Sequence, residues 1–575
     1  MPILSFNELR KEIIGRDFFF KTPYGTRLLT YADYTASGRS VQFIEKYLIK
    51  IQREYANTHT EDDLTGRNMT DLLHKAEETI KKAFNAEKNC YIIAAGTGTT
   101  GAITRFQEIL GVRLPPATKV RIETLLKKDI KLTPQQKGQF LSIYNKIEQN
   151  RPVVFIGAYE HHSNDIQWRQ AFVDVVEISL DSSGYFDLED LEKKVSDPKY
   201  KNRMKIGSFS AASNVTGLIS PVHEIARIMH KYGGIVGFDF AASAPYVEID
   251  MNKDNECYFD AIYLSPHKFV GGPGSTGVLI IRKDLYDSNI EPTCAAGGTV
   301  DYVSSEAIDY TKDVETREKP GTPGILQIIK AALAIDIKNA VGIREIEELE
   351  QKYTFKAMKH LRKNLNIFIL GNYNPYDRIS IISFLTVHDD KFLHPKFFTK
   401  LLNDLFGIQS RAGCMCAGPY GHRLLDIEIE KSEEYRALVQ KGKFGMKPGW
   451  TRLNFHYLFS ETELDYICKA IDFIATYGYK FIPLYMFNCN TGEWFHKEFT
   501  PEEDITVPNV DSVLNMELRD CFDEEKIDRK KLFAQYLEEA KIIAATLDDN
   551  PKFRPFRDPD CEKLRWFYFS SIMNE

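Results

Sequence analysis

The chain has 575 residues, of which 43% are hydrophobic and 27% charged, with a net charge of −7 and an isoelectric point near 6.1. This composition is typical of folded globular proteins and argues against disordered and fibrous classes, and the length favours more than one domain. An acidic chain lacks the basic face that nucleic-acid phosphates require, so we expect no nucleic-acid partner.

The N-terminus, MPILSFNELRKEIIGRDFFF, has no long apolar run that would indicate a secretory signal, and acidic residues interrupt any transit-peptide pattern. No later stretch of about 18 uninterrupted apolar residues predicts a membrane span. The nine cysteines, an odd number, therefore indicate reduced thiols rather than a disulfide framework. We expect a cytoplasmic protein without membrane contact.

Short apolar runs alternate with helical patterns between Tyr91 and Ile281, which predicts an α/β domain with a mainly parallel sheet wrapped by helices. One helical pattern, PVHEIARIMHKYG (221–233), begins with a proline and ends with a glycine. Residues 113–150 interrupt the alternation and are predicted to form a surface insertion of one or two helices. The predicted strands are residues 91–95, 153–157, 205–211, 234–240, 260–265 and 277–282.

A long helical pattern over residues 325–365 is predicted to lead into a smaller α+β domain. Its strand candidates are RISIISFLTV (378–387), GIQSR (407–411) and GWTRLNF (449–455), and its closing helix is ETELDYICKAIDFIATYG (461–478). Beyond residue 480 an aromatic, acidic tail carries no recognisable chemistry. We therefore predict an N-terminal segment and large domain at 1–330, a small domain at 331–480 and an extension at 481–575.

The sharpest chemical feature is LSPHKFVGGPGSTGVLIIRK (264–283), in which an apolar strand ends at Lys268 and a glycine-rich loop follows. A lysine at a strand end is commonly only a solvated charge. Between an apolar strand and close-approach glycines, however, a desolvated amine can attack an aldehyde. Ser265 and His267 at the same strand end could donate hydrogen bonds to a phosphate.

Two further strand ends carry polar groups. Asp239 ends the apolar run GIVGFDF, where a carboxylate is costly unless it meets a cation such as a protonated pyridine nitrogen. A helix N-cap is the alternative role for this residue. Upstream, AAGTGTTGAITRF places Thr97, Thr99 and Thr100 where a strand gives way to a helix, which suits phosphate binding, although such a turn is more often only a loop.

Histidines and cysteines in two loops could suggest metal ligands, but the spacing argues against it. His161 and His162 are adjacent, so their rings would point in opposite directions, and stacking on an aromatic cofactor is the more plausible role for one of them. Cys414 and Cys416 have no second cysteine pair at ligand spacing. We predict no metal site, and for Cys416 either a reactive thiol beside Arg411 or an inert loop residue.

Taken together and in order, nine segments resemble the class V aminotransferase family of fold-type I enzymes that use pyridoxal 5'-phosphate (PLP), and most of all its cysteine desulfurase and selenocysteine lyase branch. The resemblance runs from about Tyr31 to about Tyr477. The segments are YADYTASGR (31–39), GTTGAI (98–103), EHHSN (160–164), SNVTG (213–217), FDFAAS (238–243), SPHK (265–268), REKPGTP (317–323), SRAGCMC (410–416) and TRLNF (451–455).

The resemblance implies a role for each candidate residue. Lys268 would form the Schiff base with PLP and shuttle a proton, Asp239 would pair with the pyridine nitrogen, and His161 would stack on the ring. Cys416 would be the catalytic cysteine that becomes a persulfide. The phosphate would be held by Thr99, Thr100, Ser265 and His267, with Thr299 from the neighbouring subunit of a homodimer, and the substrate carboxylate by Asn214 and Arg452.

One position departs from the desulfurase pattern, because Ala242 stands where a glutamine usually follows the aspartate by three residues. We expect a cysteine desulfurase that gives alanine and an enzyme persulfide, with an amino acid as substrate and a sulfur-acceptor protein as partner. The alternatives are a lyase, epimerase or aminotransferase of the same family, or a non-catalytic scaffold. A scaffold would be expected to have lost Lys268 or Asp239, and both are present.

Overall fold

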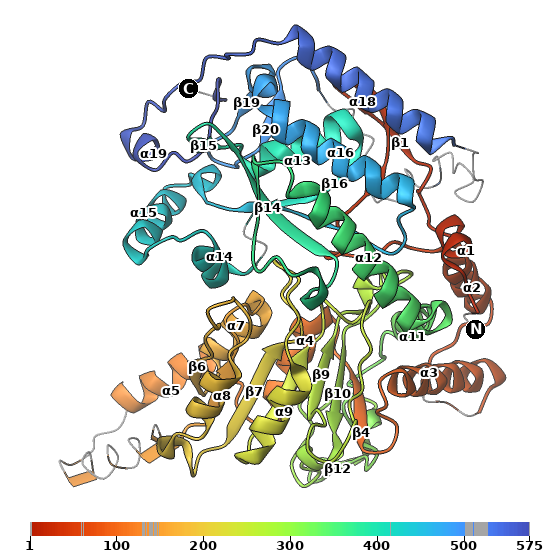
Figure 1. Ribbon diagram of the computed structural model, residues 1–575. Coiled ribbons are helices and arrows are strands. Elements are labelled where there is room, and N and C mark those ends of the chain that lie inside the picture. The colour runs from red at the N-terminus through yellow and green to blue at the C-terminus, as the bar shows by residue number, and fades with distance from the viewer. Residues whose placement is uncertain are drawn as a thin grey trace. The chain divides into compact units, whose positions relative to one another are not determined.

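The computed structural model describes residues 3–573 except His59, Glu61, Cys414, Met415 and parts of 129–148 and 501–526. The chain forms two compact units (Figure 1). The large-sheet unit comprises Ile44–Ser213 and Leu218–Ile343, and the small-sheet unit comprises Met1–Phe43, Asn214–Gly217 and Arg344–Glu575. Both units combine segments that are distant in the sequence, and the predicted boundaries at residues 330 and 480 stay predictions.

A seven-stranded mixed sheet forms the centre of the large-sheet unit, which confirms the predicted α/β class. Strand β10 is antiparallel to both of its neighbours, and the strands from β9 to β6 are parallel. In order across the sheet the strands are β4 (Cys90–Ala94), β10 (Val278–Arg282), β9 (Ala261–Leu264), β8 (Ile235–Asp239), β7 (Lys205–Ser210), β5 (Val153–Ile156) and β6 (Asp174–Glu177).

The central strands form where the sequence has continuous apolar runs, because both of their faces are covered. Every residue of β5, β7 and β9 is buried. Strands buried on both faces lack the alternation of apolar and polar residues that half-exposed strands show. Continuous apolar runs in the sequence therefore predicted them. Strand β6 lies at the sheet edge and is only partly buried, and its sequence DVVE is too short and mixed for the pattern to predict it.

Helices and a hairpin surround this sheet. The first part of the predicted insertion is helical, as α5 shows, and the rest of that prediction falls largely outside the described residues. The helices are α2 (Gln42–Gln52), α3 (Leu64–Ala83), α4 (Gly98–Ile109), α5 (Pro116–Lys128), α7 (His162–Gln170), α8 (Leu188–Val195), α9 (Val222–Lys231), α10 (Val314–Arg317) and α11 (Ile325–Val341), with η1 (Pro198–Tyr200), η2 (Pro266–Lys268) and η3 (Lys283–Leu285), and the hairpin strands are β11 (Val300–Val303) and β12 (Ile308–Tyr310).

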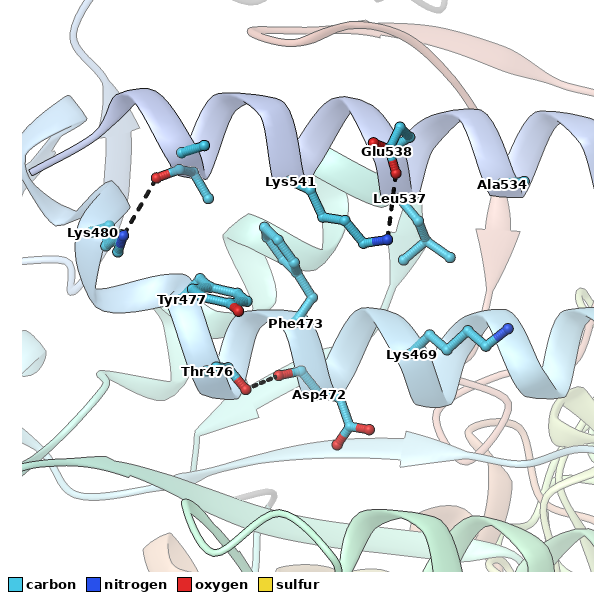
Figure 2. Close-up of a pocket in the computed structure, with 12 residues that line it drawn as sticks. Lys469, Asp472, Phe473, Thr476, Tyr477, Lys480, Ala534, Leu537, Glu538 and Lys541 are labelled. Atoms are coloured by element: carbon cyan, nitrogen blue, oxygen red, sulfur yellow. Dashed lines mark hydrogen bonds and ion pairs between the residues drawn. The ribbon is translucent and has the colours of Figure 1, made fainter. Parts of the chain in front are cut away.

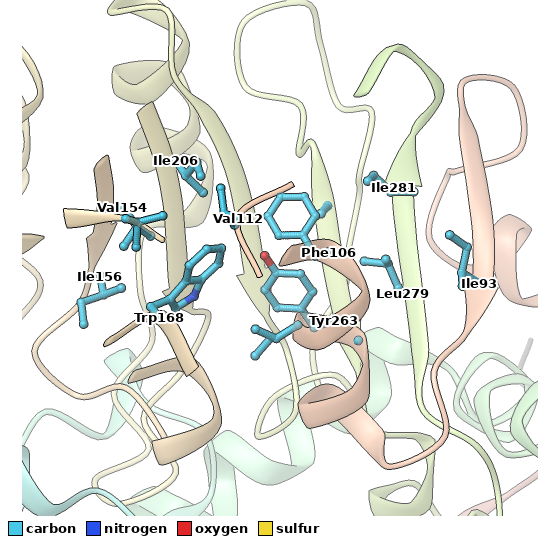
Figure 3. Packing of buried hydrophobic residues seen from close by; sticks show 14 residues of the cluster. Ile93, Phe106, Val112, Val154, Ile156, Trp168, Ile206, Tyr263, Leu279 and Ile281 are labelled. Atoms are coloured by element: carbon cyan, nitrogen blue, oxygen red, sulfur yellow. The ribbon is translucent and has the colours of Figure 1, made fainter. Parts of the chain in front are cut away.

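The core of this unit lies between the sheet and helices α4 and α7 (Figure 3). Phe106 on α4 meets Trp168 on α7 edge-on, with ring centroids 6.4 Å apart, and meets Tyr263 on β9 at 5.6 Å. All three rings are fully buried, and each such side chain stabilises the fold by roughly 1.5–3 kcal/mol. This packing holds α4 and α7 against the sheet.

The helical pattern predicted over residues 325–365 forms two helices instead of one. Helix α11 ends at Val341, and α12 (Ile343–Leu361) begins two residues later. Gly342 between them has a φ of +99°, a backbone conformation that residues with a Cβ rarely adopt. A helical periodicity continues across such a glycine, so the sequence pattern could not reveal the break.

An antiparallel sheet forms the centre of the small-sheet unit, in the order β13 (Ile367–Ile369), β14 (Ile381–His388), β18 (Trp450–Asn454) and β17 (Arg411–Gly413), with β15 (Lys391–Phe392) paired to β14. The remaining strands pair as β1 (Phe19–Thr22) with β2 (Gly25–Leu28), β3 (Thr30–Tyr31) with β16 (Ile408–Gln409) and β19 (Tyr485–Phe487) with β20 (Trp494–His496). The helices are α1 (Phe6–Lys11), α12, α13 (Pro395–Phe406), α14 (Gly418–Leu424), α15 (Ile429–Gln440), α16 (Glu461–Tyr477), α18 (Arg529–Thr546) and α19 (Pro559–Lys563), with η4 (Pro375–Asp377), η5 (Phe444–Met446) and η6 (Gly478–Leu484).

The described part of the C-terminal extension packs into this unit. Phe533 of α18 stacks on Tyr466 of α16 with ring centroids 3.9 Å apart, and the amide of Phe392 donates to Trp566 O at 3.1 Å. Figure 2 shows α18 beside α16. Phe473 and Leu537 help to line a pocket of about 800 Å³ there. None of the helices in the described ranges has both the length and the apolar character needed to cross a membrane.

Candidate active site

The turn that carries Lys268 connects β9 to β10 in the large-sheet unit. Ser265 precedes the short helix η2, and the amide of Lys268 donates to Ser265 O at 3.0 Å. The following loop folds back tightly, since a Cβ on Gly272 would lie 1.9 Å from Pro266 O. Lys268 is half-buried. The glycine-rich loop therefore closes over the lysine turn, as the sequence predicted from its close-approach glycines.

The first turn of α4 lies against the same strand end. The amide of Thr99 donates to Ser265 Oγ at 3.0 Å. Gly98 has a φ of +58°, and a Cβ there would lie 2.7 Å from Ser265 Oγ and 3.1 Å from His267 Cε1. The structure thus brings Thr99, Ser265 and His267 together around a helix N-terminus, and only glycine at position 98 leaves room there. Such a cradle of amides and hydroxyls is suited to a phosphate.

His267 is neutral at ordinary pH. Burial and the charge of Lys268 lower the pKa of His267 to about 4. A neutral imidazole keeps one N–H, so this side chain can donate one hydrogen bond without adding a charge.

Asp239 ends β8, beside β9 in the sheet, and only 4% of its surface is exposed. Its Oδ1 accepts a hydrogen bond from the amide of Ala241 at 2.8 Å. Burial raises the pKa of Asp239, whereas the Ala241 amide and the charge of Lys268 lower it. A buried carboxylate in this position is stabilised by a nearby cation, which a protonated pyridine nitrogen would provide.

His161 and Thr100 are linked through Ser163, a residue to which the sequence pattern assigned no role. His161 caps α7, and its Nδ1 accepts from the amide of Ser163 at 3.1 Å. The Ser163 hydroxyl lies 3.1 Å from His161 Nδ1 and 2.7 Å from Thr100 Oγ1. Because Nδ1 is an acceptor, the neutral imidazole carries its proton on Nε2. Ser163 therefore sets both the tautomer and the orientation of the His161 ring.

Glu160, which sequence reasoning also missed, anchors the segment before His161. It accepts from the amides of Gly157 and Ser210 at 3.1 and 2.9 Å and from Asn164 Nδ2 at 2.6 Å. Burial raises the pKa of Glu160 to about 7 in spite of these hydrogen bonds. Its spacing of four from Asn164 in EHHSN is the one signal in the sequence that could have indicated this network.

Thr299 lies in the turn before β11 and is fully buried in its own chain. Its hydroxyl donates to Ala296 O at 2.8 Å and accepts from the Ala296 amide at 3.2 Å. The hydroxyl is thus used within its own turn. The contribution of Thr299 to a neighbouring subunit stays a prediction.

In the small-sheet unit the structure brings Asn214 and Arg452 together. Arg452, on β18 and only 4% exposed, donates from Nη1 to Asn214 O at 2.8 Å and from Nη2 to Asp33 Oδ1 at 3.1 Å. The second oxygen of Asp33 accepts from Arg411 Nε at 2.8 Å. Asp33 lies in the segment YADYTASGR, but sequence reasoning gave it no role.

Cys416 is exposed and lies between β17 and α14 in the small-sheet unit. Its φ of +57° is uncommon for a residue with a side chain, and such conformations concentrate at functional sites. The thiol is close enough to Arg452 to act on it electrostatically. Cys414, which we predicted as a second thiol of this loop, lies outside the described residues.

Comparison with known proteins assigns the chain to a family. The model of the family described as aminotransferase class-V matches residues 140–439, which is more than half of the chain. The chain belongs to the class V aminotransferase family. Class V aminotransferases depend on PLP, so this chain is a PLP-dependent enzyme.

Two of the similar proteins carry the same name. A Halalkalibacterium halodurans protein named "Probable cysteine desulfurase" is 30% identical over 397 residues, which are 68% of this chain and 84% of that protein. A Staphylococcus aureus protein of the same name is 27% identical over 396 residues, with coverage of 68% and 84%. This class V chain thus spans most of the length of both relatives.

Solved structures share the fold. The apo cysteine desulfurase of Thermococcus onnurineus superposes with a TM-score of 0.61 at 22% identity, covering 78% of this chain and 95% of that one. An Escherichia coli cysteine desulfurase gives a TM-score of 0.55 at 19% identity, with coverage of 77% and 93%. At these identities the likeness supports the fold of this class V enzyme, which is the predicted fold-type I architecture.

Proposed function

We propose that this class V enzyme is a cysteine desulfurase, which converts cysteine to alanine and leaves the sulfur on Cys416 as a persulfide. The observation that carries the proposal is the exposed Cys416, held in a left-handed backbone conformation near the buried guanidinium of Arg452. A nucleophilic thiol and a group that binds the α-carboxylate are the two features that cysteine desulfuration adds to general PLP chemistry. The names of the similar proteins support the same reaction.

The residues of the large-sheet unit fit PLP. Lys268 would hold the cofactor covalently, the buried Asp239 would pair with its pyridine nitrogen, and His161 would stack on its ring with the orientation that Ser163 imposes. The cradle at the start of α4, which a Cβ on Gly98 would fill, would take the phosphate, with donors from Thr99, Thr100, Ser265 and His267. When bound, PLP supplies an electron sink for charge that develops on the substrate carbons.

Residues of the chain then position the substrate and move its protons. Arg452 and Asn214 would bind the α-carboxylate of cysteine, for which a guanidinium can supply two parallel hydrogen bonds. Lys268 Nζ would remove the proton from the substrate Cα.

The sulfur transfer balances without an added oxidant. The Cys416 thiolate attacks the substrate sulfur, an S–S bond forms and the bond between sulfur and Cβ breaks, with its electron pair passing to Cβ. The Cys416 proton and this electron pair end on Cβ, which becomes the methyl group of alanine. The net reaction is cysteine plus the enzyme thiol to alanine plus the enzyme persulfide.

A second candidate function, another PLP reaction such as elimination, racemisation or transamination, is favoured by one residue. Ala242 is buried and has no side-chain donor at the position where desulfurases usually place a glutamine. A donor to the cofactor's phenolic oxygen is then missing from the usual place, which would alter the cofactor's electronics.

Product analysis separates the two. The PLP-loaded enzyme, incubated with cysteine and in parallel with a panel of other amino acids, is expected to release equal amounts of alanine and of sulfur as sulfide after reduction. Mass spectrometry should find one additional sulfur atom on the peptide that contains Cys416. Pyruvate, a racemised amino acid or a keto acid as the main product would support the second candidate instead.

Substitution of Arg452 by alanine is expected to raise KM for cysteine at least ~10-fold with a smaller change in kcat. A hydrogen bond to a charged group contributes about 1.5–3 kcal/mol, and about 1.4 kcal/mol corresponds to a tenfold change in affinity. Steady-state kinetics check this result. Arg452→Lys keeps the charge but loses the planar guanidinium that can donate two parallel hydrogen bonds, so its KM should lie between those of Arg452→Ala and the natural enzyme. An unchanged KM in both variants would exclude Arg452 from the binding of substrate.

Three further expectations accompany the proposal. We propose that the enzyme is a homodimer in which Thr299 of each subunit helps to hold the PLP phosphate of the other. We also propose that a sulfur-acceptor protein takes the persulfide sulfur and that the protein acts in the cytoplasm. The exposed position of Cys416 supports the second of these, since an acceptor must reach the sulfur.

A further inference from the structure

Asp33, a nearly buried carboxylate of the small-sheet unit, is shared by two arginines on neighbouring strands. Arg411 on β17 and Arg452 on β18 are partners in the register of the sheet. Arg411 Nε donates to Asp33 Oδ2 at 2.8 Å, and Arg452 Nη2 donates to Asp33 Oδ1 at 3.1 Å. Each oxygen of the carboxylate therefore serves one guanidinium, and neither arginine holds Asp33 alone.

Backbone hydrogen bonds to β16 and β18 fix the position of Asp33. The residue before it, Ala32, donates its amide to Gln409 O at 2.9 Å and accepts from the amide of Asn454 at 2.9 Å. Gln409 ends β16, two residues before Arg411, and Asn454 follows Arg452 by two residues on β18. The backbone beside the carboxylate is thus held by β18, which carries Arg452, and by β16, which directly precedes the strand of Arg411.

Asp33 and its two arginine partners together carry a net single positive charge. Two guanidinium groups face one carboxylate, and the described groups that act on Arg452 electrostatically are Asp33, Arg411 and the Cys416 thiol. Burial lowers the pKa of Arg452, and Asp33 is the main influence that raises it again. Without Asp33, two adjacent arginines would be uncompensated, one of them 4% exposed.

Arg452 keeps hydrogen-bonding capacity after these contacts. Nη1 donates to Asn214 O and Nη2 to Asp33, whereas Nε is buried and has no hydrogen-bond partner among the residues that the structure describes. A buried donor without a partner is costly, and a ligand oxygen would relieve that cost. The cluster therefore has one unused donor edge and one unit of positive charge.

We propose that Asp33 is a positioning residue that sets the substrate class of this site to amino acids with a single carboxylate. It fixes the guanidinium of Arg452 so that the free edge meets the α-carboxylate, and it cancels the charge that would otherwise attract a second anionic group. This proposal rests on the proposed function only in placing the α-carboxylate at Arg452. Alanine and cysteine fit the class, and aspartate does not.

The test compares how the PLP-loaded enzyme binds L-alanine and L-aspartate, with calorimetry as the readout. The natural enzyme is expected to prefer alanine, and Asp33→Asn to shift the ratio of the two dissociation constants toward aspartate at least ~10-fold, because an unfavourable like charge has been removed. Asp33→Glu should keep the preference for alanine. Glu461→Gln is the matched control, since Glu461 is also shared by two cations, Lys352 and Lys356, at 2.5 and 2.7 Å, and should leave the ratio unchanged.

An unchanged ratio in folded, PLP-loaded Asp33→Asn would overturn the proposal, because a merely structural role changes stability without changing the choice between ligands. If Asp33→Asn does not fold, Arg411→Gln provides the second measurement. Arg411→Gln removes the positive charge of the more exposed arginine and should weaken alanine binding. Unchanged alanine binding would refute the proposal that the net positive charge of the cluster attracts the carboxylate. Failure of the proposed function is separate, since it would appear as alanine binding without release of sulfur from cysteine.

Discussion

Replacement of Lys268 with alanine is expected to abolish turnover of every amino acid and to leave PLP without a covalent link to the chain. Lys268 lies in the turn after β9, electrostatically coupled to Asp239 and His267. The neighbouring His267 is neutral and cannot form an imine, so no second amine in this turn can replace the lysine. Loss of the lysine removes the covalent link, and with it the visible absorbance of the lysine-bound cofactor. It also removes the base that takes the Cα proton.

Two variants separate chemistry from folding. Lys268→Arg keeps a positive charge toward Asp239 but cannot form an imine, so it should fold with natural stability and still lack turnover. Lys253→Ala, an exposed lysine of the same unit, should behave like the natural enzyme. Borohydride reduction followed by peptide mass spectrometry gives a readout independent of activity. Recovery of PLP on another lysine of Lys268→Arg, together with turnover, would contradict the assignment.

The central strands could be predicted from sequence because burial on both faces gives them continuous apolar runs. The direction of β10 could not be predicted in the same way, since pairing direction depends on the connection. Only the residues between Leu264 and Val278 join β9 to β10, and they form a short turn and a glycine-rich loop. A parallel return usually crosses the sheet through an α-helix, whereas this connection contains only the short helix η2 and the glycine-rich loop, and β10 pairs antiparallel.

For the candidate site as well, the sequence predicted some of the side chains and not others. Lys268 and Asp239 were recognisable because each follows or ends an apolar strand, and the ends of neighbouring parallel strands meet at one edge of a sheet. Asp33 was not recognisable as a site residue, since its partners Arg411 and Arg452 lie 378 and 419 positions away in the sequence. Hydrogen bonds between distant segments leave no periodic pattern in one sequence. Ser163 was missed for another reason, because a serine at the start of a helix is ordinary.

Replacement of Cys416 with serine is expected to abolish release of sulfur from cysteine while leaving PLP bound to Lys268. Cys416 belongs to the small-sheet unit, whereas the residues that we propose to hold PLP belong to the large-sheet unit. A hydroxyl is nearly the size of a thiol, so the left-handed backbone at position 416 should be retained, but a serine oxygen at neutral pH does not attack sulfur as a thiolate does. The enzyme should therefore still bind cysteine and fail only at the transfer of sulfur.

The controls for this prediction use the other thiols of the chain. Cys294→Ser removes a second exposed thiol, in the large-sheet unit, and should keep full activity and the persulfide on Cys416. Cys414→Ser should still form that persulfide and weaken only the onward passage of sulfur, because a neighbouring thiol can accept sulfur by exchange. Sulfide release and the mass of the Cys416 peptide are measured for each variant. Undiminished release of sulfide from cysteine by Cys416→Ser would show that the sulfur does not pass through this thiol, and it would assign the enzyme to another PLP reaction such as elimination.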